Sequence, residues 1–185
     1  MVLTDREIQA ALECKQIVID PTPGVDAFSS TSLDLTLSNF IRLWKVETVK
    51  GVEQTICPAS PGYKFNDFVK SFSDGKEIGT DGYVIKPQEF LLGWTHENVE
   101  LPTFSRLAAR VEGKSSLARL GIGIHITAPT IHAGFKGQIQ LEISNHGLFQ
   151  VKLVPRMSVC QLIFEQTLGT PDKGYAGQFY AQTKR

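Results

Sequence analysis

The feature that most constrains this chain is a set of short segments in which apolar and polar residues alternate. Ile139, Leu141 and Ile143 fall on one face of a predicted strand, and polar residues occupy the positions between them. This period of two is typical of a strand with one buried face. Because turn residues separate most of these segments and no helices alternate with them, the sequence predicts a mainly β fold of sandwich, jelly-roll or barrel type. The other candidate strands are residues 33–37, 40–46, 89–95, 107–112, 123–127 and 158–165.

A few short helices are also expected. Thr4 followed by Glu7 is a capping-box pattern, which predicts a helix that ends near Cys14. Residues 112–121 predict a second short helix, with serines near its start and a glycine at its end. Residues 52–82 contain prolines, glycines and polar residues, so we expect a long loop or excursion there with one uncertain strand.

Length and composition limit the class of protein. The 185 residues fit one domain, so we assign residues 1–185 to a single domain with a mobile tail at 169–185. The 19 basic and 19 acidic side chains are scattered and balanced, which argues against a nucleic-acid ligand and favours a small molecule. No apolar run approaches the ~20 residues that span a bilayer. The three cysteines form no C-x-x-C pair. We therefore expect a cytoplasmic protein that binds neither nucleic acid nor membrane.

The first candidate site is the predicted helix that follows Lys114. Backbone N–H groups at a helix N-terminus favour an anion, and Lys114 adds a positive charge. Arg119 lies four positions after Ser115, on the same helical face. These residues suit a phosphate chain. On the pattern alone, a capped connector helix with solvated basic residues is an equally good interpretation, and the P-loop spacing is absent.

The second candidate site is the strand at 138–144. Glu142 lies on its polar face, so it either meets solvent or projects into a polar site between strands or subunits. Periodicity alone favours the exposed carboxylate. None of the four histidines shows the paired spacing of a zinc site. His132 differs from the others because it precedes an Ala-Gly turn at the start of this strand, where its side chain could face a ligand.

Three motifs resemble the core of the dCTP deaminase family. They are E-G-K-S-S-L-A-R-L-G at 112–121, H-I-T-A at 125–128 and I-H-A-G-F-K-G-Q-I-Q-L-E-I-S-N at 131–145. The similarity extends to residues 3–8, 32–37 and 153–164, and the combined pattern is specific to the superfamily of dCTP deaminases, dUTPases and their bifunctional relatives. The resemblance implies a distorted, dUTPase-like β-barrel of jelly-roll type. It also implies a homotrimer whose active sites lie between subunits and receive a neighbour's C-terminal tail.

The resemblance implies a role for each matching residue. Glu142 matches the catalytic glutamate, and Ala128 matches a residue whose backbone carbonyl helps to hold the attacking water. Ser115 is expected to help position the same water. The residues expected to bind the phosphates or the rest of the substrate are Lys114, Ser115, Ser116, Arg119, His132, Phe135, Gln138, Tyr175 and Gln182.

The implied reaction is hydrolytic deamination of dCTP to dUTP and ammonia. A carboxylate such as Glu142 can take a proton from water and deliver it to the ring nitrogen and then to the leaving amine. Mg²⁺ is implied as a companion of the triphosphate, without protein side chains as ligands. Zinc is not expected, because zinc deaminases need an H-x-E with P-C-x-x-C and the sequence has no such cysteine pair.

Four positions depart from the family pattern. His132 stands where the family usually has an Asp that supports attack on the phosphate chain in dUTPases, which weakens the dUTPase interpretation. A dUTPase or bifunctional enzyme that forms dUMP and diphosphate stays open, because an imidazole can still act as a base. A non-catalytic nucleotide-binding member also stays open. Arg156 replaces a turn glycine, and Gln178 and Thr130 replace basic residues, which removes positive charge.

Overall fold

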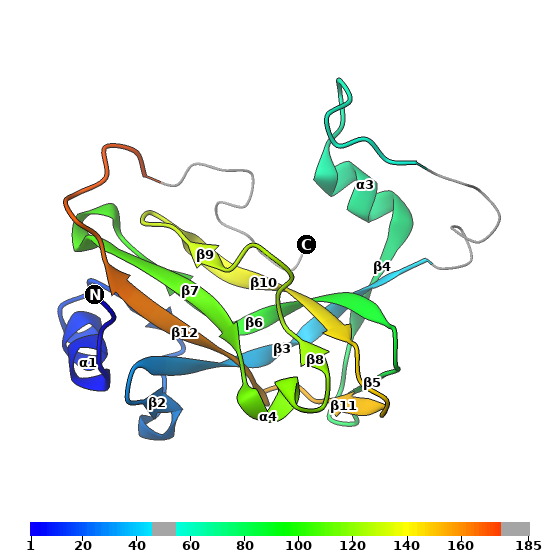
Figure 1. Ribbon diagram of the computed structural model, residues 1–185, viewed down its shortest axis with the longest axis horizontal. Helices are drawn as coiled ribbons and strands as arrows, with labels where there is room; N and C mark the ends of the chain where they lie inside the picture. Colours follow the sequence, from blue (N-terminus) through cyan, green and yellow to red (C-terminus); the bar gives the residue numbers. More distant parts are fainter. Residues whose placement is uncertain (46–54, 175–185) are drawn as a thin grey trace.

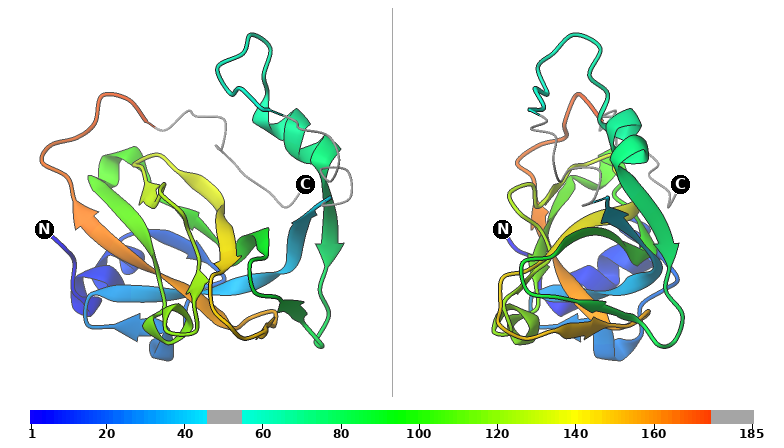
Figure 2. Two further views of the ribbon diagram at one scale, coloured as in Figure 1. Left: turned by 45° about the vertical axis from the view of Figure 1, so that its right-hand side comes forward. Right: turned by 90° about the vertical axis from the view of Figure 1, so that its right-hand side faces the viewer.

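The computed structural model describes residues 1–45 and 55–174. Within these residues, ten strands form one antiparallel sheet that curls into a half-barrel (Figure 1, Figure 2). The predicted mainly β fold with a few short helices is confirmed. Along the main path the sheet contains, in spatial order, β8 (Ile122–Gly123), β10 (Lys136–Asn145), β6 (Phe90–Glu100), β3 (Ser32–Trp44), β12 (Ser158–Gln166), β7 (Leu107–Gly113) and β9 (Thr130–Ile131).

Short elements extend this framework. β1 pairs with β6, and β2 and β4 both pair with β3. β5 and β11 pair with each other in a separate two-stranded sheet. The bounds of these strands and of two single-turn 3-10 helices are β1 (Val18–Asp20), η1 (Val25–Ala27), β2 (Phe28–Ser29), β4 (Ser73–Glu77), β5 (Tyr83–Ile85), η2 (Thr103–Ser105) and β11 (Val151–Leu153).

The predicted alternation places the core correctly. Leu33, Leu35 and Leu37 of β3 are completely buried. On β10, Ile139, Leu141 and Ile143 turn to the same core, as a period of two requires. β3 runs through both of the segments predicted at 33–37 and 40–46, as far as Trp44. Val46 lies outside the described residues.

The two ends of the main sheet path are joined by the chain itself. β8 pairs with β10 at one end and β9 pairs with β7 at the other, and residues 124–129 connect β8 to β9. The prediction of a strand over 123–127 is therefore wrong beyond Gly123. The alternating pattern is present there, but these residues cross from one sheet edge to the other instead of pairing along a strand. We call residues 124–129 the seam linker.

Helix α1 (Asp5–Glu13) begins as the capping box predicts. The Glu7 carboxylate accepts hydrogen bonds from the backbone N–H of Thr4, at 3.2 Å, and from the Thr4 hydroxyl. The hydroxyl bond lowers the pKa of Glu7 below its usual value. Ile8 and Ala11 are buried on the face turned to the core. None of the helices in the described residues is long and apolar enough to cross a membrane.

Residues 52–82 were expected to form a long loop with one uncertain strand. Helix α3 (Phe65–Phe72) shows that part of this segment is helical instead. It stands beside β4 and packs against the face of the sheet opposite the main core (Figure 1). The Phe68 ring lies 4.8 Å from that of Phe72 and 5.9 Å from that of Trp44, between ring centroids. The sequence does not predict this helix, because prolines and glycines flank it. Its stability comes from aromatic packing on distant strands and not from local helix propensity.

Candidate active site

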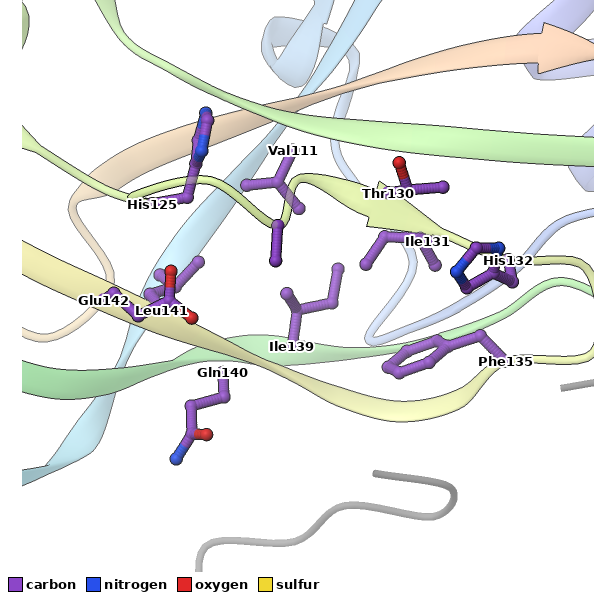
Figure 3. Close-up of a pocket in the computed structure, with 11 residues that line it drawn as sticks. Val111, His125, Thr130, Ile131, His132, Phe135, Ile139, Gln140, Leu141 and Glu142 are labelled. Atoms are coloured by element: carbon purple, nitrogen blue, oxygen red, sulfur yellow. The ribbon is translucent and has the colours of Figure 1, made fainter. Parts of the chain in front are cut away.

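A cavity of about 240 Å³ lies at the seam of the half-barrel, between β10 and the segment that contains the seam linker and β9 (Figure 3). In the close-up, Glu142 and His125 lie at one end of the pocket, and His132 and Phe135 lie at the other. At the seam the barrel is not closed by hydrogen bonds between strands, so these residues border a cavity there. The lining residues are Val111, His125, Ala128, Thr130, Ile131, His132, Phe135, Ile139, Gln140, Leu141 and Glu142.

The floor of this pocket is hydrocarbon. Ile139 and Leu141 reach it from β10, and Val111 reaches it from β7 across the seam. Ile131 and Phe135 complete the floor, and all five side chains belong to the buried core. A flat apolar group can therefore bury its faces here without leaving polar groups of the protein unpaired.

Glu142 supplies the one carboxylate among the described lining residues. Its Oε2 accepts a hydrogen bond of 3.1 Å from the backbone N–H of Ile126 in the seam linker. Glu142 is half-buried, whereas the side chain of Ile126 is 60% exposed. The sequence left open whether Glu142 meets only solvent or enters a polar site, and the structure places it in the pocket. A carboxylate oriented by a backbone N–H at the end of an apolar cleft can exchange protons with a bound ligand.

Two histidines line the same pocket in different ways. His132 is exposed and stands at the rim, with Phe135 beside it (Figure 3). The ring of His125 points away from Glu142, and its Nε2 lies 3.8 Å from a carboxylate oxygen of Glu112. Among the described residues, the buried Nδ1 of His125 has no hydrogen-bond partner. His132 is therefore placed to meet a ligand, while His125 lines the pocket as part of the seam linker.

Gln138 does not line the pocket, although it was expected to contact substrate. Its side-chain Nε2 donates to the carbonyl oxygens of Thr95, at 2.8 Å, and His96, at 3.2 Å. Here β6 carries two extra residues, since Gln138 pairs with Asn98 but Gln140 pairs with Trp94. The buried amide satisfies carbonyls that this bulge would leave unpaired. The alternation on β10 could not reveal a bulge that lies in the neighbouring strand.

The residues expected to bind phosphates also lie outside this pocket. Helix α4 (Ser115–Ala118) has only four residues, because β7 occupies the positions up to Gly113. Ser115, Ser116 and Arg119 are exposed, and Lys114 forms an ion pair with Asp34. Within one chain, the structure does not bring these groups together with Glu142 in the pocket.

The helix ends at Ala118, earlier than the predicted end at Gly121, although Gly121 has the left-handed conformation expected of a glycine that follows a helix. This residue has φ of 87°, and a Cβ there would come within 2.3 Å of the backbone nitrogen of Gly147. Leu117, within the helix, is buried, whereas Leu120, just after it, is 43% exposed. The helix is too short to present a full apolar face.

Ala128, Phe135 and His132 line the pocket with Glu142, as expected. Tyr175 and Gln182 lie outside the described residues. Gln140 and the hydrocarbon side chains of Val111, Ile139 and Leu141 were not predicted as site residues. The alternation of apolar residues on β10 is visible in the sequence, but no local pattern indicates that the barrel is open beside it. In the described part of the chain, no group of three or more His, Cys, Asp or Glu side chains is arranged to hold a metal ion.

A curled antiparallel sheet with a single-carboxylate pocket at its seam defines a mainly β protein built to hold a small, flat ligand. Residues 2–167 match the family model described as dCTP deaminase-like. The chain belongs to this family, as the motifs at 112–121, 125–128 and 131–145 predicted.

Two relatives and one solved structure give the extent of the similarity. The chain is 37% identical over 195 residues to "dCTP deaminase, dUMP-forming" of Methanothermobacter thermautotrophicus, covering 100% of this chain and 93% of the relative. It is 35% identical to "dCTP deaminase" of Rhodospirillum rubrum, covering 100% and 92%. The crystal structure of 2'-deoxycytidine 5'-triphosphate deaminase from Agrobacterium tumefaciens has a TM-score of 0.66 at 24% identity. That match covers 88% of this chain and 47% of the other chain, and it shows the common fold.

Proposed function

We propose that this protein hydrolyses the exocyclic C4–N bond of dCTP and releases dUTP and ammonia, with Glu142 as general acid and base. The observation that carries the proposal is the position of Glu142, which is the one carboxylate among the lining residues of a largely apolar pocket in a chain of the dCTP deaminase-like family. The hydrocarbon lining would surround the part of the pyrimidine ring that carries no polar atoms. The carboxylate would then stand beside the ring edge that carries N3 and the amine.

The proposed chemistry needs one proton carrier and one water. Glu142 takes a proton from the water, whose oxygen adds to C4 of the ring, and passes this proton to N3. The carboxylate then takes the second water proton from the new C4 hydroxyl and passes it to the amine, which leaves as ammonia when the C4–N bond breaks and the C4=O bond forms. The backbone N–H of Ile126 holds one carboxylate oxygen, which leaves the other free to contact water. The backbone of Ala128, which also lines the pocket, is a suitable acceptor for that water.

We further propose that the phosphate site is completed by a second copy of the chain in a homotrimer. Support comes from the separation of the two groups, since Ser115, Ser116 and Arg119 are exposed and do not line the pocket of Glu142. A neighbour's α4 and Lys114 would face the triphosphate, and Ser115 would help to hold the water. Mg²⁺ would enter bound to the triphosphate, which is part of the substrate.

The decisive assay follows ammonia from the purified protein with dCTP and Mg²⁺. Glu142→Gln keeps the shape of the side chain but cannot carry the proton, so we expect ammonia release to fall at least about 1,000-fold. Glu77→Gln is the matched control, because Glu77 is an exposed carboxylate on β4, outside the pocket. Turnover that survives Glu142→Gln would refute the assignment. Tight dCTP binding without turnover in the wild type would instead identify a non-catalytic nucleotide-binding protein.

The same assay tests the metal proposal. EDTA is expected to lower the rate and added Mg²⁺ to restore it, whereas a zinc-selective chelator such as 1,10-phenanthroline should leave the rate unchanged. Inhibition by the zinc-selective chelator would contradict the proposed direct action of Glu142.

A second candidate product is dUMP. The relative from Methanothermobacter thermautotrophicus is named as dUMP-forming, and the chain covers 93% of its length. A bifunctional enzyme would release diphosphate together with ammonia. Scoring both products from dCTP, and diphosphate alone from dUTP, separates a deaminase from a dUTPase and from a bifunctional enzyme.

A further inference from the structure

The wall beside Glu142 is made of aliphatic side chains. Val111, Ile139 and Leu141 are 3%, 4% and 1% exposed, and all three line the pocket. Val111 and Ile139 lie on opposite sides of the seam and point toward each other (Figure 3). Glu142 stands at one end of this wall, next to Leu141 in sequence and in the close-up. A ring whose reacting carbon reaches Glu142 must therefore place one edge along hydrocarbon.

The polar atoms of cytosine decide which edge of the ring lies along the hydrocarbon. One edge carries O2 and N3, which need hydrogen-bond partners, and the other carries C5 and C6, which do not. If O2 and N3 faced Val111 and Ile139, they would be buried without partners, which is unfavourable. The C5–C6 edge therefore lies along the aliphatic wall. N3 and the amine then lie toward Glu142 and the backbone of the seam linker.

We propose that the pocket also accepts a small apolar substituent at C5, so that the enzyme deaminates 5-methyl-dCTP to dTTP. This inference rests on the proposed deaminase function. Water adds to C4, the C4–N bond breaks, and the amine leaves as ammonia, so the reaction consumes one water and needs no other reactant. The methyl group takes no part in the chemistry and contacts only the aliphatic wall.

The same wall should discriminate against a polar substituent of similar size. A methyl group gains contacts with hydrocarbon, whereas the hydroxyl of 5-hydroxymethyl-dCTP would lose its water without gaining a partner. We expect kcat/KM for 5-methyl-dCTP to lie within about tenfold of the value for dCTP. The value for 5-hydroxymethyl-dCTP should fall about 100-fold below that for 5-methyl-dCTP, the usual limit for rejecting an added hydroxyl by an apolar pocket.

The test measures ammonia release from dCTP, 5-methyl-dCTP and 5-hydroxymethyl-dCTP by the wild-type protein. Deamination of dCTP without deamination of 5-methyl-dCTP overturns this inference and leaves the proposed function in place. Failure with all three nucleotides overturns the proposed function and this inference together. Equal rates with the methyl and hydroxymethyl compounds would also overturn it, since the C5 edge would then face water.

Two variants test whether the C5 edge of the ring lies along the aliphatic wall. Val111→Ile adds one methylene to it, so the ratio of kcat/KM for 5-methyl-dCTP to that for dCTP should fall about tenfold. Val84→Ile, on the exposed face of β5, makes the same change far from the pocket and should leave the ratio unchanged. Because the ratio compares two substrates on one protein, it is insensitive to the fraction of protein that folds. A ratio that does not respond to Val111→Ile would show that the C5 edge lies elsewhere.

Discussion

At the scale of single residues, we expect His132 to decide which product the protein forms. It lies at the rim of the pocket, at the opposite end from Glu142 (Figure 3). The resemblance places an Asp here, and a carboxylate can activate water for attack on a phosphate chain. The imidazole places its ring nitrogens differently from the oxygens of an Asp carboxylate. Glu142, the proposed proton carrier, and His132 therefore stand at opposite ends of the pocket.

We predict that His132→Asp adds diphosphate release to the activity of the protein. The wild type should form dUTP from dCTP and release little diphosphate from dUTP, because the imidazole replaces the carboxylate. The variant should raise diphosphate release from dUTP by at least about 100-fold, the lower range for a positioned general base. The measurement is diphosphate release with dUTP as substrate.

His146→Asp is the matched control for this prediction. His146 is also exposed, but it hydrogen-bonds to Ser144 and does not line the pocket. Rapid diphosphate release by the wild type would contradict the prediction and favour the bifunctional interpretation, with His132 as a competent base.

At the scale of elements, the pairing of β6 with β10 depends on one buried amide. β6 bulges by two residues opposite Gln138, and the Gln138 side chain donates to the carbonyl oxygens of Thr95 and His96 in that bulge. The Thr95 hydroxyl also links the two strands, since it accepts a hydrogen bond of 2.9 Å from the backbone N–H of Ile139. These bonds fix the register four residues before Glu142. The Gln138 amide therefore supports the strand that carries Glu142.

We predict that Gln138→Leu destabilises the fold by about 2 kcal/mol, because it removes both hydrogen bonds that the buried amide donates to the bulge. Gln140→Leu is the matched control on the same strand. Gln140 is only half-buried, so its replacement should change the free energy of unfolding by less than about 1 kcal/mol. Urea denaturation midpoints measure both effects. Equal midpoints for the two variants would show that the Gln138 amide is not needed for the bulge.

How far the sequence predicts an element depends on what stabilises it. The alternation of Leu33, Leu35 and Leu37 predicts β3 correctly, because a period of two is a local property of the chain. Arg156 replaces a turn glycine of the family pattern. Its φ of 70° lies in the left-handed region that favours glycine. Helix α3 and the bulge opposite Gln138 could not be predicted, because both depend on contacts with distant strands. The same limit applies to the pocket, whose carboxylate was recognised but whose seam was not.

At the scale of the whole molecule, the open seam explains why a barrel fold carries a pocket at all. The sheet path ends at β8 and β9, and the seam linker joins these ends without pairing along them. The side chains of Val111 and Ile139 would pack against each other in a closed barrel, but here they border a cavity of about 240 Å³. The linker also supplies the N–H that holds Glu142. The part of the fold that leaves the sheet incomplete is thus the part that positions the carboxylate.

The proposed assembly predicts that two inactive variants restore each other. Glu142→Gln removes the carboxylate of the pocket, and Arg119→Ala removes an exposed cation that lies outside it. If each site takes its pocket from one copy and its α4 segment from a neighbour, random mixing produces about a quarter of sites with both groups intact. Ammonia release should therefore rise to about a quarter of the wild-type rate when the two chains are co-refolded.

Mixing Arg119→Ala with Ser115→Ala gives no such sites, because both changes fall on the same segment, and this mixture should stay inactive. If the first mixture also stays inactive while sedimentation shows mixed trimers, Glu142 and Arg119 must serve the same site from one chain.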